Sequence, residues 1–388
     1  MARVEDRWTR KDKTRTEEYG KGKRWRAVWT EAGTERKQSF TTKDAARAHL
    51  VWVEHNQRSG TYVSQDRGRV FVRDLIDVWV EGQVHLKPST MAATKSDVRA
   101  TIKPYWGDKI LADIRRSDVQ AWVSDMAAPL TGKPKAARTV DTIYGRFRTF
   151  LIWCVDEGRI TASPAKGVNL PKGQKREHIF LTVAQVRRLA NEIDQHFTDL
   201  IWLLATTGLR FGEAAELRTK DIDVKRRRIR VARSVTEVDG KMVIGPPKNG
   251  KERTVPMTVF MAARLGPYLE GRGREVLAFP SERGHHLRSN NFKTREYDIA
   301  VEAAGLPEGL WVHDLRHTAA SLAVHSGASV KSVQRMLGHA SAALTLDIYS
   351  GLFDQELSDV AARMDSLIQP AADPNLPGSP LRAVKSAS

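Results

Sequence analysis

The chain has 388 residues, with 63 Lys and Arg against 46 Asp and Glu, a net charge of +17 and a pI near 10.0. This basic balance favours a polyanionic partner, with nucleic acid as the leading candidate. A single cysteine, no signal-peptide core and no apolar run of about 18 residues disfavour a disulfide framework, secretion and a membrane span. We therefore expect a soluble, cytoplasmic protein with three domains.

A small β-sheet backed by one helix is predicted for residues 1–65. The segment KRWRAVW at 23–29 alternates basic with apolar residues, the period of a half-buried strand, and 35–40 supplies a second strand. Thr41 or Thr42 then caps the helix.

Basic residues on these strands are candidate DNA contacts, because a strand face can meet phosphates or enter a groove. They are Arg24, Arg26 and Lys37. A solubilising charged face explains the same pattern, so both interpretations stay open.

From residue 70 to 165 the apolar period becomes helical, and we predict a four-helix module. The expected helices lie at 71–80, from Pro88 onward, at 117–123 with Ser117 as the cap, and at 137–157. Candidate phosphate contacts on this module are Lys95, Arg99, Arg138, Arg146 and Arg148. A helical spacer with solvated charges is the alternative.

A linker and a third domain complete the expected organisation. Gly, Pro and Lys at 166–175 predict an exposed hinge, which would let the flanking modules close around a duplex. Residues 176–368 are expected to form a mixed α+β domain, mostly helical, with a short hairpin near 222–256. The Pro-rich segment 369–388 is expected to be disordered. The whole chain is thus predicted to be multidomain and mainly α, with small β elements.

Six residues of the third domain form a set suited to phosphodiester chemistry. Phosphate oxygens gain charge in the transition state, so catalysis needs fixed cations and strong donors around one phosphate. A tyrosine can hold a cut strand end covalently, which removes the need for a high-energy cofactor. The six are Arg210, Lys248, His313, Arg316, His339 and Tyr349. We expect neither metal nor cofactor.

Arg210 lies in the segment TGLRFGE at 207–213, where a glycine turn leads into a helix whose amide-rich end attracts phosphate. A lone arginine there would usually be an exposed surface residue without a catalytic role. Glu213 could orient the guanidinium, or it could be a first-turn acid favoured by the helix dipole.

Lys248 precedes Asn249 and Gly250, a strong signal for a hairpin turn. A lysine at a hairpin tip can swing into a site and protonate a leaving oxygen. Lys251 competes for this role, and a solvated turn lysine is the plain alternative.

His313 and Arg316 are three residues apart, so on a helix they share a face and can address one phosphate. His317 and His325 are expected to point elsewhere, as structural or exposed residues.

Gly338 is expected to end a helix and release His339 into a tight turn. Ser341 then caps the segment that carries Tyr349. Judged alone, this tyrosine would normally be a core residue.

Arginine, lysine, His-x-x-Arg, Gly-His and tyrosine in this order closely resemble the tyrosine recombinase family, specifically its phage integrase branch. The matching segments are 207–213, 313–318, 337–339 and 345–349. The N-terminal sheet and the helical module resemble the arm-binding and core-binding domains of that family by pattern rather than by motif.

The resemblance implies a site-specific recombinase. Tyr349 would attack the scissile phosphate to form a 3'-phosphotyrosyl bond and a free 5'-hydroxyl. Arg210 and Arg316 would hold the non-bridging oxygens, with a further hydrogen bond from His339. His313 would assist proton transfer at the tyrosine.

The resemblance also implies partners. Lys248 would protonate the leaving 5' oxygen, and a 5' end from a second duplex would reverse the reaction through a Holliday junction. This exchange requires a homotetramer on double-stranded attachment sites, and the amphipathic stretch 352–367 is expected to pack on a neighbour. A host DNA-bending protein and an excision directionality factor are further candidates, in a bacterial host's cytoplasm and nucleoid.

Two rival functions remain. A type IB topoisomerase shares the tyrosine chemistry without exchanging partners, but the chain lacks a long helical linker before Tyr349. A DNA-binding regulator that kept the fold without catalysis would bind DNA equally well after Tyr349→Phe.

Overall fold

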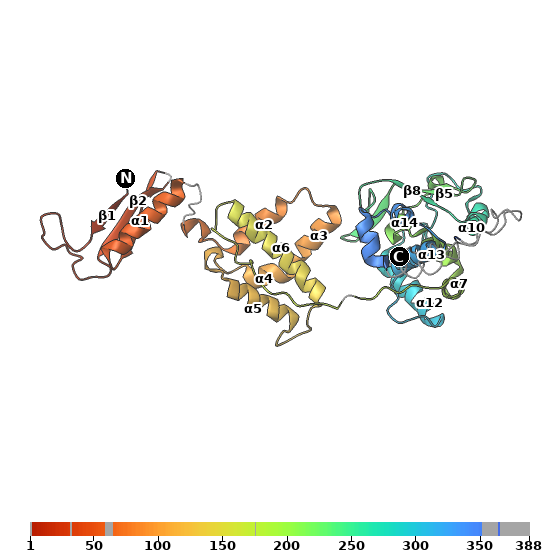
Figure 1. Cartoon of the computed structure of the whole chain (residues 1–388), viewed down its shortest axis with the longest axis horizontal. Coiled ribbons are helices and arrows are strands. Elements are labelled where there is room, and N and C mark those ends of the chain that lie inside the picture. The colour runs from red at the N-terminus through yellow and green to blue at the C-terminus, as the bar shows by residue number, and fades with distance from the viewer. Residues whose placement is uncertain (1, 32, 59–64, 175, 351–363, 365–388) are drawn as a thin grey trace, which may run out of the picture. The chain divides into compact units, whose positions relative to one another are not determined.

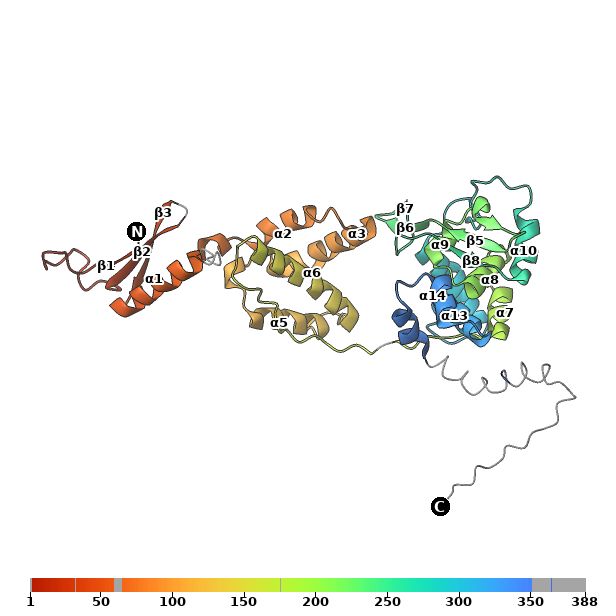
Figure 2. The same ribbon diagram turned by 45° about the horizontal axis from the view of Figure 1, so that its top comes forward.

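Helices and three small antiparallel sheets make up the described part of the chain in this computed structural model (Figures 1 and 2). The structure describes residues 2–31, 33–58, 65–174, 176–350 and 364. The chain divides into two units, 1–174 and 175–388. This architecture confirms the predicted fold class. None of the described helices is both long and apolar enough to cross a bilayer.

The N-terminal segment forms a three-stranded sheet with one helix. The elements are β1 (Arg3–Asp6), β2 (Trp25–Glu31), β3 (Thr34–Phe40) and α1 (Lys43–Arg58), with β2 in the centre of the sheet. Ala27 and Trp29 of β2 pack against Ala46 and Val53 of α1. The two predicted strands and the helix are present. β1 adds a third strand in a segment that the alternation pattern had not identified.

The helical module packs around a cluster of aromatic side chains. Its elements are η1 (Gln65–Gly68), α2 (Val72–Glu81), α3 (Pro88–Asp97), η2 (Val98–Ile102), α4 (Lys103–Trp106), η3 (Leu111–Asp113), α5 (Arg116–Ala127) and α6 (Ala137–Asp156). The ring of Trp106 lies 4.7 Å from that of Phe147 and 5.6 Å from that of Trp122, between centroids. All three side chains are buried. Cys154 is buried in the same core.

The predicted start of the third helix of this module is wrong by a short distance. Ser117 lies inside α5, which begins at Arg116, so Ser117 is not the cap. The carboxylate of Asp118 instead accepts a hydrogen bond from the backbone N–H of Arg115, at 2.9 Å. An acid one turn into the helix therefore satisfies the exposed donor.

The first residues of the predicted linker are held on α5. The guanidinium of Arg116 donates to the carbonyl of Gly167 at 2.9 Å. The side chain of Gln120 accepts from the backbone N–H of Asn169 at 2.8 Å and donates to its carbonyl at 3.1 Å. The linker is thus anchored as far as Asn169.

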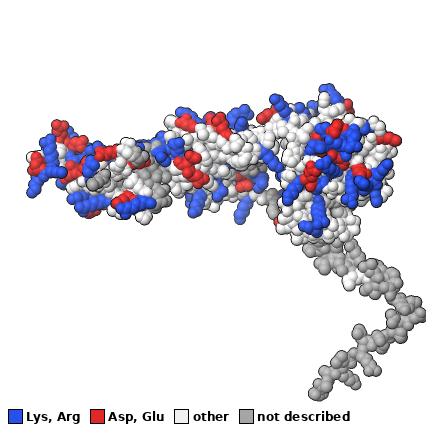
Figure 3. Space-filling model, turned by 90° about the horizontal axis from the view of Figure 1, so that it is seen from above, with Lys and Arg blue, Asp and Glu red and all other residues white. Residues whose placement is uncertain are grey.

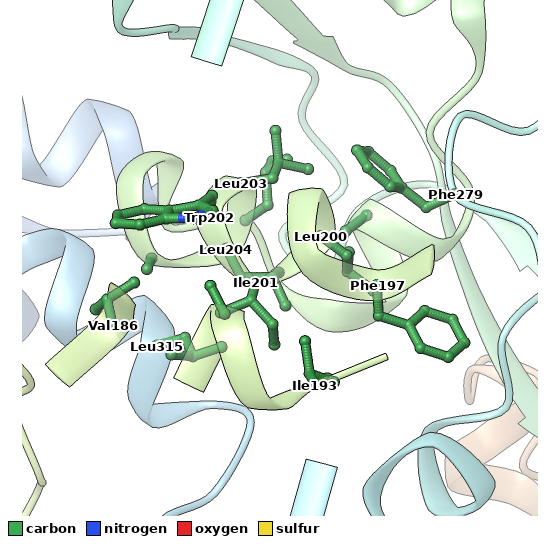
Figure 4. Packing of buried hydrophobic residues seen from close by; sticks show 14 of the residues in the cluster. Val186, Ile193, Phe197, Leu200, Ile201, Trp202, Leu203, Leu204, Phe279 and Leu315 are labelled. Carbon is green, nitrogen blue, oxygen red and sulfur yellow. The ribbon is translucent and has the colours of Figure 1, made fainter. Parts of the chain in front are cut away.

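In the second unit, helices surround α8 (Thr198–Thr207), whose residues 200–205 are all buried. Figure 4 shows Leu200, Ile201 and Leu204 packed among Val186, Ile193 and Leu315. The helices are α7 (Val183–Glu192), η4 (Gln195–Phe197), α8 (Thr198–Thr207), α9 (Phe211–Ala215), η5 (Thr219–Asp221), α10 (Val259–Leu269), α11 (Ser289–Phe292), η6 (Lys293–Tyr297), α12 (Asp298–Ala303), α13 (Asp314–His325) and α14 (Val330–Leu337). A further helical segment spans 342–350.

The β elements of this unit differ from the single hairpin predicted near 222–256. They are β4 (Ile222–Asp223), β5 (Arg228–Val231), β6 (Ser234–Val238), β7 (Lys241–Gly245) and β8 (Arg253–Pro256). β6 pairs with β7, whereas β8 pairs with β5.

The hairpin turn lies at Asp239 and Gly240, which both have positive φ, as a two-residue hairpin turn requires. The loop with Asn249 and Gly250 instead joins β7 to β8, strands of different sheets. Lys248 therefore does not lie at a hairpin tip.

The aromatic core of the helical module gives a testable stability difference. Trp106→Ala should lower the free energy of unfolding of this module by about 3–5 kcal/mol, because it leaves a cavity between Trp122 and Phe147. Thermal unfolding of the full chain measures the shift. Leu130→Ala is the control because Leu130 is fully exposed. Equal shifts for the two variants would contradict the assigned core.

Candidate active site

The junction of α8 and α9 positions Arg210. Gly208 ends α8 with φ +66°, a left-handed conformation that favours glycine. A Cβ at this position would lie 2.6 Å from a methyl carbon of Leu337, so the close packing also requires glycine. Arg210 then begins α9 as its N-cap residue. The predicted glycine turn before a helix is confirmed.

Glu213 is a buried anion that contacts two arginines. Its carboxylate accepts from the backbone N–H and from Nη1 of Arg210, at 2.9 and 3.0 Å. It also accepts from Nη1 and Nη2 of Arg253, at 2.9 and 2.6 Å. Burial would raise the pKa of Glu213, but the contacts with Arg253 and then Arg210 outweigh it and hold this pKa below its ordinary value. Glu213 is therefore both a first-turn acid and the partner of Arg210.

Arg316 joins the two turns that carry Arg210 and His339. Its guanidinium donates from Nη1 to the carbonyl of Gly208 and from Nη2 to that of Leu337, at 2.5 and 2.6 Å. Arg316 is only 2% exposed. Burial, and then the charge of Arg210, lowers the pKa of Arg316 to about 9, which leaves it cationic at neutral pH.

His313 is the N-cap residue of α13, one turn before Arg316. Desolvation, followed by the charges of Arg316 and Arg210, lowers the pKa of His313 to about 4. The side chain reaches the surface, but the charges of Arg316 and Arg210 still disfavour an imidazolium at this position. His313 is thus neutral at pH 7.

Gly338 ends α14 in the left-handed conformation, and His339 follows in a turn as predicted. Nδ1 of His339 lies 3.0 Å from Oγ1 of Thr345. Burial and the charges of Arg316 and Arg210 lower the pKa of His339 to about 4. The ring is parallel to that of Tyr349, with centroids 6.5 Å apart.

Tyr349 is 1% exposed and lies against the face of α13. Its hydroxyl is 2.8 Å from Nδ1 of His317. Burial raises the pKa of Tyr349 to about 12, against the opposing effect of Arg316. The nucleophile of the proposed chemistry is therefore a neutral phenol in this state.

The expectation that His317 points away from the site is wrong. His317 is 5% exposed, contacts the hydroxyl of Tyr349, and stacks on His178 with centroids 3.9 Å apart. On a helix, residues four apart share a face, so the spacing from His313 could have indicated this position. Burial, then the neighbouring His178 and His313, lowers the pKa of His317 to about 3. His317 is therefore a neutral ring in hydrogen-bond contact with the phenol of Tyr349.

Lys248 and Lys251 both lie exposed in the loop between β7 and β8. The backbone N–H of Gly250 donates to the carbonyl of Pro247 at 2.7 Å, which makes a tight turn. Asn249, between the two lysines, donates its side-chain amide to the carbonyl of Gly338. The loop is therefore attached to the turn that carries His339.

Within the described residues, one group has donor atoms close enough to hold a metal ion: His178, Asp314 and His317. Asp314 is already paired with Arg176, with Nη2 and Oδ2 2.5 Å apart. The charge of Arg316 also acts on His317. These cations disfavour a metal ion at this position.

Two of the candidate DNA contacts in the N-terminal sheet, Arg26 and Lys37, share one face. Trp25, Ala27 and Trp29 face α1, so alternation places Arg26 on the opposite side. Lys37 lies there too, because it pairs with Val28 in the register.

Each basic residue of this sheet has an acidic neighbour. Arg24 pairs with Asp6 at 2.8 Å, Arg26 lies 3.9 Å from Glu18, and Lys37 pairs with Glu35 at 2.9 Å. Figure 3 shows the resulting mixture of positive and negative side chains over this segment.

Four of the five basic candidates in the helical module are exposed: Lys95, Arg99, Arg138 and Arg148. Arg146 differs, because it pairs with Asp97 and its side chain is 18% exposed. Burial lowers the pKa of this arginine. Arg146 therefore connects α6 to the end of α3.

The buried neutral state of His317 predicts a pH dependence of stability. The unfolded chain takes up a proton on this residue near pH 6.5, but the folded chain does so only near pH 3. The contribution of His317 to the free energy of unfolding is thus fully present above about pH 7 and is lost as the pH drops toward 3. His317→Gln should reduce the loss between pH 7.5 and 5.0 by up to about 2 kcal/mol.

Urea unfolding at the two pH values measures this difference. His325→Gln is the control, because His325 is exposed on the same helix. An equal loss of stability in wild type and His317→Gln would show that His317 is not held neutral by burial.

Comparisons with known proteins agree with this geometry. Residues 179–356 match the phage integrase family, and 71–127 match the phage integrase N-terminal SAM-like domain. The integrase of Mycobacterium phage D29 is 28% identical over 308 residues, which cover 77% of this chain and 79% of that protein. A XerC-like tyrosine recombinase of Caldanaerobacter subterraneus subsp. tengcongensis is 25% identical over 361 residues, 84% of this chain and 90% of its own length.

Solved structures share the fold. The Tn1549 transposon integrase in complex with a circular intermediate DNA has a TM-score of 0.64 at 20% identity, covering 72% of this chain and 95% of that one. A lambda integrase tetramer bound to a Holliday junction has a TM-score of 0.57 at 18% identity, covering 81% and 93%. With the two family matches and the arrangement around Arg210, Arg316 and Tyr349, the chain belongs to the phage integrase family of tyrosine recombinases.

Proposed function

We propose that this protein is the integrase of a phage or another mobile element, which cuts and rejoins duplex DNA at attachment sites through a 3'-phosphotyrosyl intermediate. One observation carries the proposal. Arg316 bonds to both turns that position Arg210 and His339, and the adjoining side chain, His317, contacts the hydroxyl of Tyr349. Residues far apart in sequence thus meet around one place where a phosphate can bind.

Charge and hydrogen bonding at this place suit a scissile phosphate. Arg210 and Arg316 would bind the non-bridging oxygens, and a neutral His339 would donate a further hydrogen bond from Nε2. The oxygen of Tyr349 then attacks phosphorus, and the bond to the 5' oxygen breaks. Lys248 would protonate that oxygen, while His313 would assist removal of the phenolic proton.

Tyr349 must change its surroundings before it reacts. Its hydroxyl is buried against His317, so the segment at 342–350 must shift to bring it to a phosphate. DNA binding would trigger this shift if a phosphate binds the arginines more tightly once Tyr349 has moved. Binding would then favour the shifted arrangement of 342–350.

The ester with Tyr349 conserves bond energy, so a free 5'-hydroxyl from a second duplex can reverse the reaction. Strands exchanged in pairs in this way pass through a Holliday junction and need four protomers. A lambda integrase tetramer on such a junction shares this fold. Of the stretch 352–367, proposed to pack on a neighbour, the structure describes only Met364.

DNA contacts outside the site are assigned by domain. We assign arm-site binding to residues 1–65 through Arg24, Arg26 and Lys37, and core-site binding to residues 70–165. The exposed candidates Lys95, Arg99, Arg138 and Arg148 support the second assignment. A host DNA-bending protein and a directionality factor for excision would act with the tetramer.

The nucleophile can be tested by trapping the covalent protein–DNA adduct. Wild type should form 3'-linked adducts with DNA flanking its gene without added metal, and Tyr349→Phe should form none while binding DNA equally well. Tyr297→Phe is the matched control, since Tyr297 is also a buried tyrosine of this unit. If wild type binds specifically but never forms an adduct, the protein is a regulator rather than a recombinase.

The N-terminal sheet can be tested through its salt dependence. Changing Arg24, Arg26 and Lys37 together to alanine should reduce the slope of log affinity against log salt for arm DNA by about 0.9 for each phosphate that these side chains neutralise. Adduct formation on the core site should persist. The control removes three charges from α1 instead, at Lys43, Arg47 and Arg58. If both triple variants reduce the salt slope equally, the effect comes from overall charge, and Arg24, Arg26 and Lys37 do not contact arm DNA specifically.

A further inference from the structure

Arg253 was not among the predicted site residues, yet both of its terminal nitrogens bind the carboxylate of Glu213. Its Nη1 and Nη2 bind the two carboxylate oxygens of Glu213 at 2.9 and 2.6 Å. The same two oxygens accept from Arg210. Because Glu213 has no exposed side-chain surface, water cannot replace either arginine. The orientation of Arg210 therefore depends on where Arg253 holds the carboxylate.

Arg253 also contacts the turn that carries His339. Its Nε donates to the carbonyl of Met336 at 3.1 Å, in the last turn of α14. Its aliphatic stem packs on Gly338, where a Cβ would lie only 2.8 Å from Cδ of Arg253. The side chain of Arg253 thus links α9 to the end of α14, just before His339.

The position of Arg253 in the chain also connects it to the loop that carries Lys248. Arg253 is the first residue of β8 and pairs with Val231 of β5, so the loop with Lys248 ends at this arginine. Asn249 of that loop donates to the carbonyl of Gly338, next to the stem of Arg253. The loop is consequently attached to the His339 turn at two points.

These contacts engage the whole guanidinium of Arg253 with the protein. Nε, Nη1 and Nη2 each have a protein acceptor, and the side chain is 11% exposed. We infer that Arg253 is a positioning residue that fixes Arg210, His339 and the Lys248 loop relative to one another. This inference rests on the proposed function, because it concerns the efficiency of the same site.

Lysine cannot replace this guanidinium. An ammonium group lacks the planar pair of donors that matches a carboxylate and the third donor that reaches Met336. Arg253→Lys therefore keeps the charge but should allow the three attached parts to shift. A displacement of about 1 Å at a catalytic group costs on the order of 100-fold in rate.

The kinetic test measures single-turnover adduct formation on a duplex with the crossover site. Arg253→Lys should slow it on the order of 100-fold with DNA affinity unchanged. Arg230→Lys is the control, because Arg230 of β5 forms an exposed pair with Glu252, the residue before Arg253, and it should stay within about twofold of wild type. A rate for Arg253→Lys within about threefold of wild type would overturn the inference.

Amide hydrogen exchange of the DNA-free full chain gives a readout that does not need cleavage. Arg253→Lys should accelerate exchange at 210–213, 248–252 and 337–339, whereas Arg230→Lys should not. Unchanged exchange at these three places would overturn the positioning role even if the wild type cleaves DNA. If exchange changes as expected but wild type forms no adduct, the proposed function fails and the positioning role stands.

Discussion

Arg210, Arg253 and Arg316 bring like charges together in the folded protein before any phosphate arrives, and the buried carboxylate of Glu213 offsets part of their repulsion. It accepts from Arg210 and from both terminal nitrogens of Arg253. Removing one member of such a buried set leaves an uncompensated charge, at a typical cost of about 3–5 kcal/mol. The remaining positive charge is what an incoming phosphate can neutralise, so the site is stable enough to fold and still suited to an anion.

Burial keeps Tyr349 a neutral phenol in the free protein, with its hydroxyl against His317. The pKa of Tyr349 is about 12 and that of His317 about 3, so the proton remains on the phenol oxygen. A histidine this weak as a base cannot generate a tyrosinate without substrate. In the proposed reaction, the proton would therefore leave during the attack on phosphorus, when the phosphate has changed the electrostatic surroundings. This order would limit unwanted chemistry on other electrophiles.

The sequence predicted the site where motifs have rigid local geometry, and it was less successful where contacts are long-range. Gly208 and Gly338 are recognisable helix ends, so the placement of Arg210 and His339 followed from them. The strand pairing was misjudged, because Asn249 and Gly250 carry a strong hairpin signal but lie between sheets. Arg253 could not be ranked from the chain alone, since its partner Glu213 is 40 positions away, whereas the four-residue spacing of His317 from His313 was a usable signal.

The anchoring of residues 167–169 on α5 also limits how far apart the two units can act. Leu170 also packs on the core of the helical module and Arg176 is bound to Asp314 in the second unit, so only residues 171–175 lie between the two fixed points. At about 3.3–3.6 Å per residue, this tether spans about 20 Å, less than one turn of B-DNA. Once one unit has bound a duplex, a tether this short gives the other a high effective concentration on the neighbouring base pairs. In the proposed function, the chain would therefore read a compact core site, and a few residues inserted after Leu170 would lengthen the stretch of DNA that it can bridge.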